Sequence, residues 1–166
     1  QARMPDLVIS LSHEVSPEAR EFDRLSTTIA NAYIQPQMAS YLASFQARFN
    51  DEGLTCPILM MTAGGGMTTI ETAARLPIRL VESGPAGGAI LAARIAAETS
   101  ESEVLSFDMG GTTAKLCLID HFRPQSARKF VIARAARFIK GPGMPVRIPV
   151  IEMIEIGAGG GSIAHV

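Results

Sequence analysis

Bulky aromatic side chains are scarce in this chain of 166 residues. It has no tryptophan, two tyrosines and seven phenylalanines, against fifteen glycines. That balance favours turns and close approaches of the backbone over a core filled by aromatic rings. Because 47% of the residues are hydrophobic and 19% are charged, the composition also excludes a disordered chain. The length suffices for one domain with a real core or for two small lobes.

Cysteine is equally scarce, with only Cys56 and Cys117 in the chain. Neither has the close spacing of paired metal ligands, and each lies in an apolar run. Both are therefore predicted to be reduced thiols buried in the core. A reducing cytoplasm fits this prediction.

An excess of charge of either sign is also lacking, since 15 basic and 16 acidic side chains give a formal net charge of −1. Binding to nucleic acid or to an anionic membrane surface usually needs a basic patch, so neither partner is expected. No apolar run approaches the ~20 residues that span a bilayer. The chain begins at Gln1 and ends inside an apolar run, which indicates an internal piece of a larger protein.

The first third of the chain is predicted to be rich in helix. Residues 7–11 are an apolar run typical of a buried strand, and residues 16–18 are of the types that begin a helix. Apolar residues then recur every three or four positions, which predicts one long amphipathic helix. Pro36 should kink or split this helix, and Gly53 should end it as a left-handed cap. The apolar stripe comprises Phe22, Leu25, Ile29, Tyr33, Ile34, Met38, Tyr41, Leu42, Phe45 and Phe49.

The remaining elements are read from shorter apolar runs between glycine, proline and polar clusters. The alanine-rich helix among them is apolar nearly all round and is expected to be buried. The strand at residues 130–133 is expected to pair beside the strand at residues 112–120. The predicted strands are 57–61, 78–81, 103–108, 112–120, 130–133 and 146–156, and the predicted helices are 69–75 and 86–98.

The most informative segment is an apolar strand that ends at Asp108. Gly110 and Gly111 follow it, and Thr112 and Thr113 then lead into another apolar strand. Glycines in a tight turn remove the Cβ atoms that would keep a phosphate away, and backbone N–H groups there can donate to phosphate oxygens. The threonine hydroxyls add donors. An aspartate at a strand end can hold Mg²⁺, usually through water. An ordinary hairpin, whose aspartate accepts hydrogen bonds from the turn, fits the same pattern.

Residues 108–113 resemble the second phosphate motif of the actin-like ATPase superfamily, which includes sugar kinases and heat-shock chaperone ATPases. Three further blocks, in the same order, resemble one branch of it, the hydantoinase A / oxoprolinase family. They are residues 12–18 with 27–33 and Pro36, residues 82–88, and residues 157–164. The resemblance covers nearly the whole chain. It implies an α/β fold, with a mixed sheet and flanking helices, that forms part of an actin-like ATPase.

The same resemblance makes residues 1–166 a fragment of the family's core domain. Residues 1–100 would be a helix-rich linking part with a connecting helix, and residues 101–166 would hold the phosphate hairpin and a glycine loop. Many members carry a Thr-Asp or similar pair where this chain has Ala114 and Lys115. Lys115 either neutralises phosphate or is a solvated strand lysine. The family's first phosphate motif is absent from the chain.

The implied site is a cleft lined by three segments. Asp108 would hold Mg²⁺ and serve as the catalytic residue. Glu82 could bind water or metal, and the helix beginning at Pro85 would expose free N–H groups toward the cleft. Glycines in that helix could equally serve close packing alone. The predicted contacts to nucleotide are Gly110, Gly111, Thr112, Thr113, Gly84, Gly87, Gly88, Gly159, Gly160, Gly161 and Ser162.

The function implied by the resemblance is ATP-dependent opening of a cyclic amide, a hydantoin or 5-oxoproline, with ATP and Mg²⁺ as cofactors. A hydantoinase B-type partner subunit is the expected protein partner. Three other readings stay open: a subunit of an ATP-dependent ketone carboxylase, a nucleotide-binding module without turnover, and a fragment that binds nothing tightly by itself.

Overall fold

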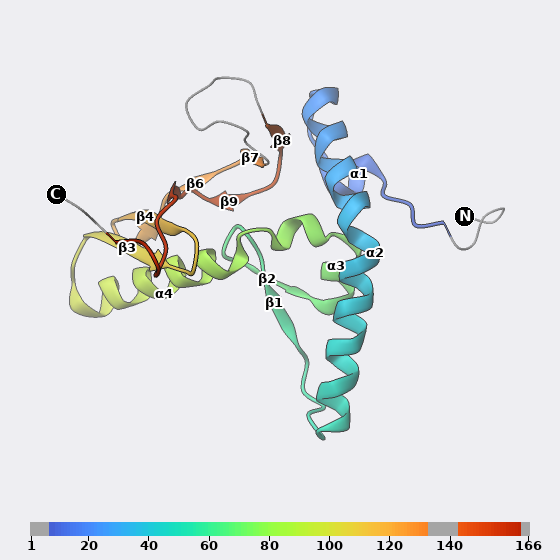
Figure 1. Cartoon of the computed structure of the whole chain (residues 1–166), viewed down its shortest axis with the longest axis horizontal. Helices are drawn as coiled ribbons and strands as arrows, with labels where there is room; N and C mark the ends of the chain where they lie inside the picture. Colours follow the sequence, from blue (N-terminus) through green and yellow to red (C-terminus); the bar gives the residue numbers. More distant parts are fainter. Residues whose placement is uncertain (1–6, 133–142, 164–166) are drawn as a thin grey trace.

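The computed structural model describes residues 7–132 and 143–163, which combine helices with antiparallel strands and confirm the α/β class. Two groups of elements lie side by side (Figure 1). The long helix α2 and its neighbours form one group, and α4 with the sheet of β3 and β4 forms the other. The N-terminal part of the chain contributes α1 (Ser12–Val15), α2 (Glu21–Asp51), β1 (Leu59–Met61), β2 (Met67–Thr69), α3 (Ile70–Arg75), the 3-10 helix η1 (Pro77–Leu80) and α4 (Ser83–Thr99).

The C-terminal part is built from short strands. They are β3 (Glu103–Met109), β4 (Ala114–Asp120), β5 (Arg123–Pro124), β6 (Ser126–Ala127), β7 (Phe130–Ile132), β8 (Met144–Val146), β9 (Val150–Ile151) and β10 (Ile154–Ile156). One sheet has the order β10-β4-β3, with β5 also paired to β4, while β1-β2, β6-β9 and β7-β8 are separate two-stranded ribbons.

Every strand pair between described residues is antiparallel. The parallel strand pairs that a mixed sheet would contain are therefore not seen in the part of the chain that the structure describes. The physical reason is connectivity: α3, η1 and α4 join the β1-β2 ribbon to a different sheet, and not to neighbouring strands of one sheet.

Helix α2 departs from the sequence prediction at its start and agrees with it at its end. It begins at Glu21 and not near residues 16–18, since Arg20 adopts a left-handed φ of 80° immediately before it. It continues through Pro36 without being split. At the other end Gly53 has φ 78°, its N–H donates to the carbonyl of Asn50 at 3.0 Å, and the next N–H reaches the carbonyl of Phe49 at 2.9 Å. This pair of bonds is a Schellman cap, so the predicted left-handed glycine is confirmed.

The face that α2 buries is more polar than its sequence suggests. Its buried residues are Asp23, Ser26, Thr27, Ala30, Asn31 and Leu42. Half of the apolar stripe, by contrast, is exposed, namely Phe22, Leu25, Ile29, Tyr33 and Tyr41. The helix therefore packs against the molecule mainly through hydrogen bonds in its first half and through apolar contacts in its second.

Several predicted strands take another form. Residues 7–11 pair with no strand of the described residues, and four of their five side chains are exposed. The segment at residues 78–81 lies mostly in η1, whose first residue is Pro77. The long strand predicted at residues 146–156 is divided among β8, β9 and β10. Strand β7 pairs with β8 and not with β4, and Ala133 lies outside the described residues.

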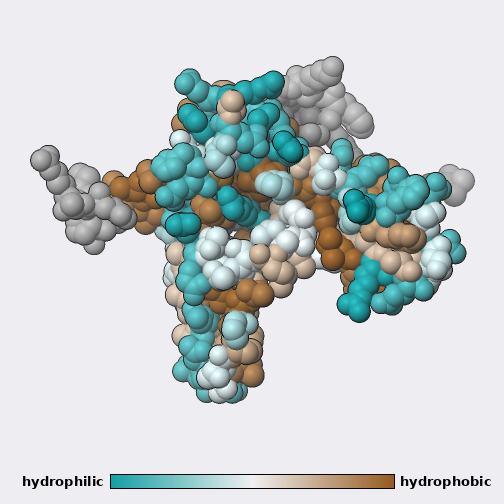
Figure 2. Space-filling model, turned by 180° about the vertical axis from the view of Figure 1, so that it is seen from behind, coloured by the Kyte–Doolittle hydropathy of each residue, from teal (hydrophilic) through white to brown (hydrophobic). Residues whose placement is uncertain are grey.

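Helix α4 buries one face instead of being buried all round. Ala86, Ala89, Ala93 and Ala96 are buried, at helical spacing. Two of these alanines pack with Cys117 of β4, so small side chains bring the helix close to the sheet. The rest of the helix surface exposes Ile90, Leu91 and Ile95. Apolar patches also appear between the hydrophilic regions of the surface shown in Figure 2.

The largest core cluster joins distant parts of the chain. Its buried residues from the first half of the chain are Val15, Ala30, Ala63, Leu76 and Ile78. They pack with three buried residues of the C-terminal segment, Val146, Ile148 and Val150. Apolar burial thus holds that segment against α1, α2 and η1. Of the two cysteines, Cys117 is buried as predicted, whereas Cys56 is exposed, because it lies in a loop before β1 and not inside a strand.

Candidate functional site

The segment predicted to bind phosphate forms a hairpin, with its residues in the expected order. Strands β3 and β4 pair over seven positions, ending with Asp108 opposite Lys115 and Met109 opposite Ala114. Residues 110–113 form the connecting loop, which is closed by a hydrogen bond of 2.9 Å from the Gly110 N–H to the Thr113 carbonyl. The Asp108 side chain is exposed at the end of β3.

The last glycine loop lies directly on this hairpin. The Gly160 N–H donates to the Gly110 carbonyl at 3.0 Å. A Cβ on Gly159 would lie 2.1 Å from the Gly111 carbonyl oxygen and 2.6 Å from the Thr112 nitrogen. No side chain fits at those distances, so only glycine permits this approach. The pairing of β10 with β4 carries the loop to this place.

The glycine loop is itself a closed turn. The Gly159 N–H donates to Ser162 Oγ at 3.1 Å, and the Ser162 N–H donates to the Gly159 carbonyl at 2.8 Å. The N–H groups of Gly159 and Gly160 are therefore already engaged. Within the described residues, those of Gly111, Thr112, Thr113 and Gly161 have no acceptor in the protein. They are donors left for a ligand at the meeting of the two loops.

Lys115 is not a solvated strand lysine. Its side chain is 16% exposed and forms an ion pair with Glu82, which is the residue before α4. Glu82 has a left-handed φ of 63° and makes no side-chain capping bond to the helix. Both residues, together with Thr113 of the hairpin loop, line an open cleft of about 710 Å³. This ion pair fastens the start of α4 to the hairpin strand.

The glycines of α4 are not brought to the hairpin. No hydrogen bond within the described residues joins Gly84, Gly87 or Gly88 to the loop at residues 110–113. A Cβ on Gly87 would lie 3.8 Å from the Met61 side chain, whereas Gly84 and Gly88 face open space. Close packing therefore accounts for at most one of the three, and their predicted contact with nucleotide stays a prediction.

The glycine cluster at residues 64–66 is a turn. It connects β1 to β2, and the Thr62 N–H donates to the Gly66 carbonyl at 2.8 Å. Gly65 has φ 80°, where a side chain is strained, and a Cβ there would also meet Ile90 of α4 at 2.8 Å. Local backbone geometry explains these glycines without a ligand.

Asp108 is the carboxylate that the hairpin itself offers to a metal ion. Within the described residues, Asp108 makes no ion pair, and no group of three His, Cys, Asp or Glu side chains is close enough together to hold a metal. Mg²⁺ bound with a nucleotide typically takes one or two carboxylates and completes its shell with phosphates and water. An exposed, uncommitted aspartate beside free N–H donors fits that requirement.

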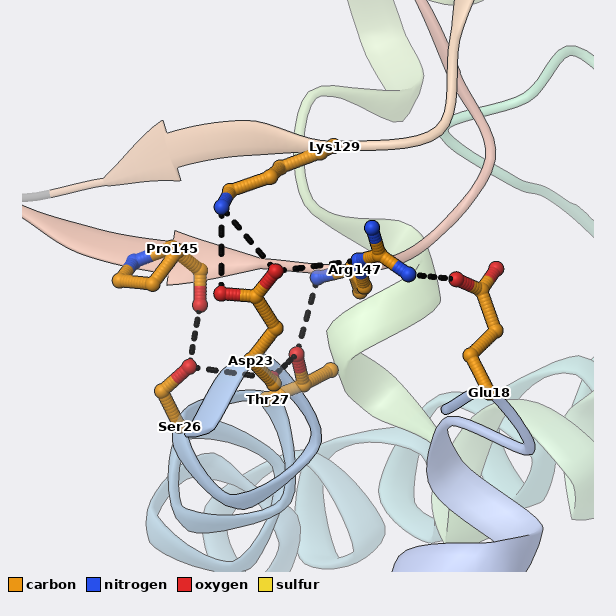
Figure 3. Close-up of polar contacts among 7 residues, drawn as sticks. All are labelled: Glu18, Asp23, Ser26, Thr27, Lys129, Pro145 and Arg147. Atoms are coloured by element: carbon orange, nitrogen blue, oxygen red, sulfur yellow. Dashed lines mark hydrogen bonds and ion pairs between the residues drawn. The ribbon is translucent and has the colours of Figure 1, made fainter. Parts of the chain in front are cut away.

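Sequence reasoning missed a charged network between α2 and the C-terminal segment (Figure 3). Lys129 Nζ lies 3.1 Å from both carboxylate oxygens of Asp23, whose side chain is 9% exposed, and Arg147 Nε lies 3.1 Å from Asp23 Oδ2. Arg147 also pairs with Glu18. The hydrogen bonds from Lys129 lower the pKa of Asp23 below its ordinary value. The partners lie more than a hundred positions apart, so no local pattern marks them.

Backbone contacts complete this network. The Thr27 hydroxyl accepts from the Arg147 N–H at 2.9 Å, and the Ser26 hydroxyl donates to the Pro145 carbonyl at 2.5 Å. Farther along α2, the fully buried Asn31 accepts from the Ile78 N–H at 3.2 Å and donates to the Arg75 carbonyl at 3.1 Å. Within the block at residues 27–33, Thr27, Ala30 and Asn31 are therefore buried packing residues, whereas Ile29 and Tyr33 are exposed.

No helix among the described residues has the length and apolar character needed to cross a membrane.

The amino-acid sequence of this chain is similar to those of known proteins. The model of the family described as Hydantoinase/oxoprolinase matches residues 24–166. An uncharacterized protein of Methanocaldococcus jannaschii is 40% identical over 158 residues, covering 93% of this chain and 23% of its own. The caprolactamase alpha subunit of Pseudomonas jessenii is 30% identical over 165 residues, covering 99% of this chain and 22% of its own.

Two solved structures share the arrangement. The ATP-dependent caprolactamase from Pseudomonas jessenii superposes with a TM-score of 0.77 at 29% identity, over 99% of this chain and 23% of that one. A nucleotide-free acetone carboxylase superposes with a TM-score of 0.73 at 23% identity, over 89% of this chain and 19% of that one, which shows a common fold.

The chain spans less than a quarter of the length of the curated relatives that it matches. The family model nevertheless covers most of the chain, from the start of α2 through both glycine motifs. The chain belongs to the hydantoinase/oxoprolinase family.

Proposed function

We propose that this chain supplies one half of the phosphate clamp of an ATP-dependent enzyme that opens a cyclic amide. The observation that carries the proposal is the meeting of two glycine motifs, which lie 49 positions apart at Gly110 and Gly159 and touch through the backbone. Such close contact between two loops serves no apolar core. It gathers free N–H donors beside an aspartate, as phosphate binding requires.

Each residue then has a separate task. The free N–H groups, among them those of Gly111, Thr112 and Gly161, would donate to phosphate oxygens. The Gly159 N–H is engaged by Ser162 Oγ within its own loop, and the Gly160 N–H is engaged by the Gly110 carbonyl of the hairpin. Asp108 would hold Mg²⁺ through its exposed carboxylate, with water and phosphate completing the shell. The hydroxyl groups of the hairpin threonines would add donors. Bound ATP would supply the phosphoryl group that activates the amide oxygen of the substrate.

The likeness to caprolactamase at 30% identity favours a cyclic amide as the substrate class, with a hydantoin or 5-oxoproline as the specific candidates. That relative is named as an alpha subunit, which supports a partner subunit for this protein as well. A cytoplasmic location, where ATP is available and thiols stay reduced, fits the two free cysteines.

The proposal is tested by Asp108→Asn in the full-length protein. The variant is close to isosteric and removes the charge that would hold Mg²⁺, so ATP hydrolysis stimulated by a cyclic amide should fall at least about 100-fold. Initial rates with caprolactam, hydantoin and 5-oxoproline as separate substrates provide the measurement. Glu103→Gln, at the exposed opposite end of the same strand, is the matched control and should retain wild-type rates.

Retention of amide-dependent ATP hydrolysis by Asp108→Asn would disprove the metal role of Asp108. Turnover that requires a ketone and bicarbonate, and that no cyclic amide stimulates, would assign the protein to ketone carboxylation. Tight ATP binding without turnover of a cyclic amide or a ketone would identify the protein as a nucleotide-binding module.

A further inference from the structure

Asp108 and Lys115 face each other across the hairpin, yet they do not pair. The antiparallel register places them directly opposite on adjacent strands. Side chains so placed point to the same face, with Cβ atoms about 5 Å apart, and opposite charges at such positions normally attract. Within the described residues, however, the ion pair of Lys115 is with Glu82, and Asp108 has none.

Glu82 is held in place by the backbone. It adopts a left-handed φ of 63° at the residue before α4, a conformation that costs energy in any residue other than glycine. Its carbonyl accepts the first bond of the helix from the Ala86 N–H at 3.2 Å. Its carboxylate makes no capping bond to the helix and is directed to Lys115 instead. Strain retained at one residue, with the side chain committed elsewhere, is typical of functional positions.

Lys115 is confined at the same time. Its side chain is only 16% exposed, whereas the Glu82 side chain is 41% exposed. On the same face of β4, two positions along, Cys117 is packed against Ala86 and Ala89 of α4. The stem of Lys115 therefore lies between the strand and the start of the helix, and its ammonium group stays near Glu82.

We infer that Glu82 is a positioning residue that draws Lys115 away from Asp108 and so keeps the Asp108 carboxylate free for a divalent cation. This inference rests on the proposed role of Asp108. Without the Glu82 carboxylate, the Lys115 ammonium has two carboxylates at its register positions, Asp108 across the hairpin and Glu155 on β10. When it turns to Asp108, it competes with the metal ion. Glu82 acts through Lys115 and contacts neither the metal nor the phosphates.

The test uses Mn²⁺ in place of Mg²⁺, with ADP present, and measures free Mn²⁺ by electron paramagnetic resonance in the full-length protein. Glu82→Gln should weaken Mn²⁺ binding roughly fivefold, the range of one partly exposed ion pair. Lys115→Met, added to Glu82→Gln, should restore binding to within about twofold of the wild type, because no ammonium group is left to compete. Lys115→Met alone should bind Mn²⁺ at least as tightly as the wild type.

Glu82→Gly is a second variant that removes the carboxylate and controls for misfolding. Glycine tolerates the left-handed φ of this residue without strain, so this variant should fold at least as well as the wild type while it lacks the carboxylate. Its loss of Mn²⁺ affinity should equal that of Glu82→Gln. Rescue by Lys115→Met distinguishes competition by the lysine from general damage, which no second substitution at Lys115 would repair.

The outcomes separate this inference from the proposed function. If Asp108→Asn binds Mn²⁺ as the wild type does, the metal role of Asp108 is wrong. If Asp108→Asn loses Mn²⁺ but Glu82→Gln and Glu82→Gly do not, only the positioning role is wrong. A double variant as weak as Glu82→Gln overturns it as well, since Glu82 would then contact the metal itself. Weaker binding by Lys115→Met alone would show that Lys115 contacts the phosphates.

Discussion

At the scale of single residues, Gly159 decides whether two distant loops can meet. A methyl group there would lie 2.1 Å from the Gly111 carbonyl oxygen, far inside contact distance, and the obstacle is backbone, which cannot swing aside as a side chain can. The hydrogen bond from Gly160 to Gly110 depends on the same approach. The proposed clamp therefore depends on the absence of one side chain.

Gly159→Ala should separate the two loops. Forcing them apart should lower the free energy of unfolding by about 3 kcal/mol, and amide-dependent ATP hydrolysis should be lost with it. Thermal unfolding and initial rates measure the two effects. Gly157→Ala is the control, because a Cβ at that position has nothing within 4 Å and should change neither quantity. Equal behaviour of the two variants would contradict the proposed contact.

The two cysteines should differ in reactivity. Cys117 is buried, and burial raises the pKa of its thiol, so the reactive thiolate is scarce at neutral pH. Cys56 is exposed. N-ethylmaleimide at neutral pH should modify Cys56 rapidly and Cys117 only after the protein is unfolded in guanidinium, as peptide mapping by mass spectrometry will show. Equal labelling of the two in native protein would mean that β4 is not packed against α4.

At the scale of secondary-structure elements, helix α2 is held by its polar face. Asp23 near its first turn accepts both bonds from Lys129, and Thr27 one turn later accepts from the Arg147 backbone. These bonds attach the C-terminal ribbon of β7 and β8 to the helix. The long apolar stripe, which dominates the sequence of the helix, contributes little to this attachment because half of it is exposed.

Asp23→Asn should lower the free energy of unfolding by about 2 kcal/mol at pH 7, the usual contribution of a hydrogen bond to a charged group. Because the folded state lowers the pKa of Asp23, its contribution is fully present above the unfolded pKa of about 3.9 and is lost as the pH falls through the lower folded value. The difference between variant and wild type should therefore shrink below about pH 4.

Urea unfolding at a series of pH values provides the measurement for Asp23. Glu21→Gln is the matched control, since Glu21 is an exposed acidic residue in the same first turn, and it should lose only the interaction with the helix dipole, about 0.5 kcal/mol. A constant difference between Asp23→Asn and the wild type down to pH 2 would contradict the charge-based explanation.

At the scale of the whole molecule, one face of the sheet of β3, β4 and β10 is apolar and largely exposed within the described part of the chain. Helix α4 packs with Cys117 on one face, so cross-strand register assigns the alternate residues to the other. On that face the exposed residues are Leu105, Phe107, Met109, Leu118, Ile154 and Ile156. A contiguous apolar surface of this kind promotes association in water.

The isolated chain should consequently bind the dye 8-anilinonaphthalene-1-sulfonate and self-associate. Leu105→Lys combined with Phe107→Lys should reduce both, because two charges interrupt the apolar face. Dye fluorescence and sedimentation velocity check the outcome. Glu101→Lys, an exposed loop substitution near the same sheet, is the control for added positive charge and should leave both unchanged. Undiminished dye binding by the double variant would place the apolar surface elsewhere.

Features that depend on a few consecutive residues could be predicted from the sequence alone. The strand at residues 103–108, the turn at Gly110 and Gly111, the left-handed cap at Gly53 and the short helix at residues 69–75 all follow from local backbone preferences and capping chemistry. The structure confirms them, with the end of the strand and the start of the helix each displaced by one residue. Four motifs in the order of a known family were sufficient to identify that family.

Only the tertiary structure decided which of these segments touch. Gly159 contacts Gly111, and Lys115 pairs with Glu82 and not with Asp108. Helix α2 buries its polar face. Each of these contacts is between residues that lie tens of positions apart in the sequence. Periodicity predicts that a helix has an apolar side, but the free energy of the whole packing arrangement selects the side that is buried. For the same reason the sequence could name the two glycine motifs, whereas their joining into one candidate site required the fold.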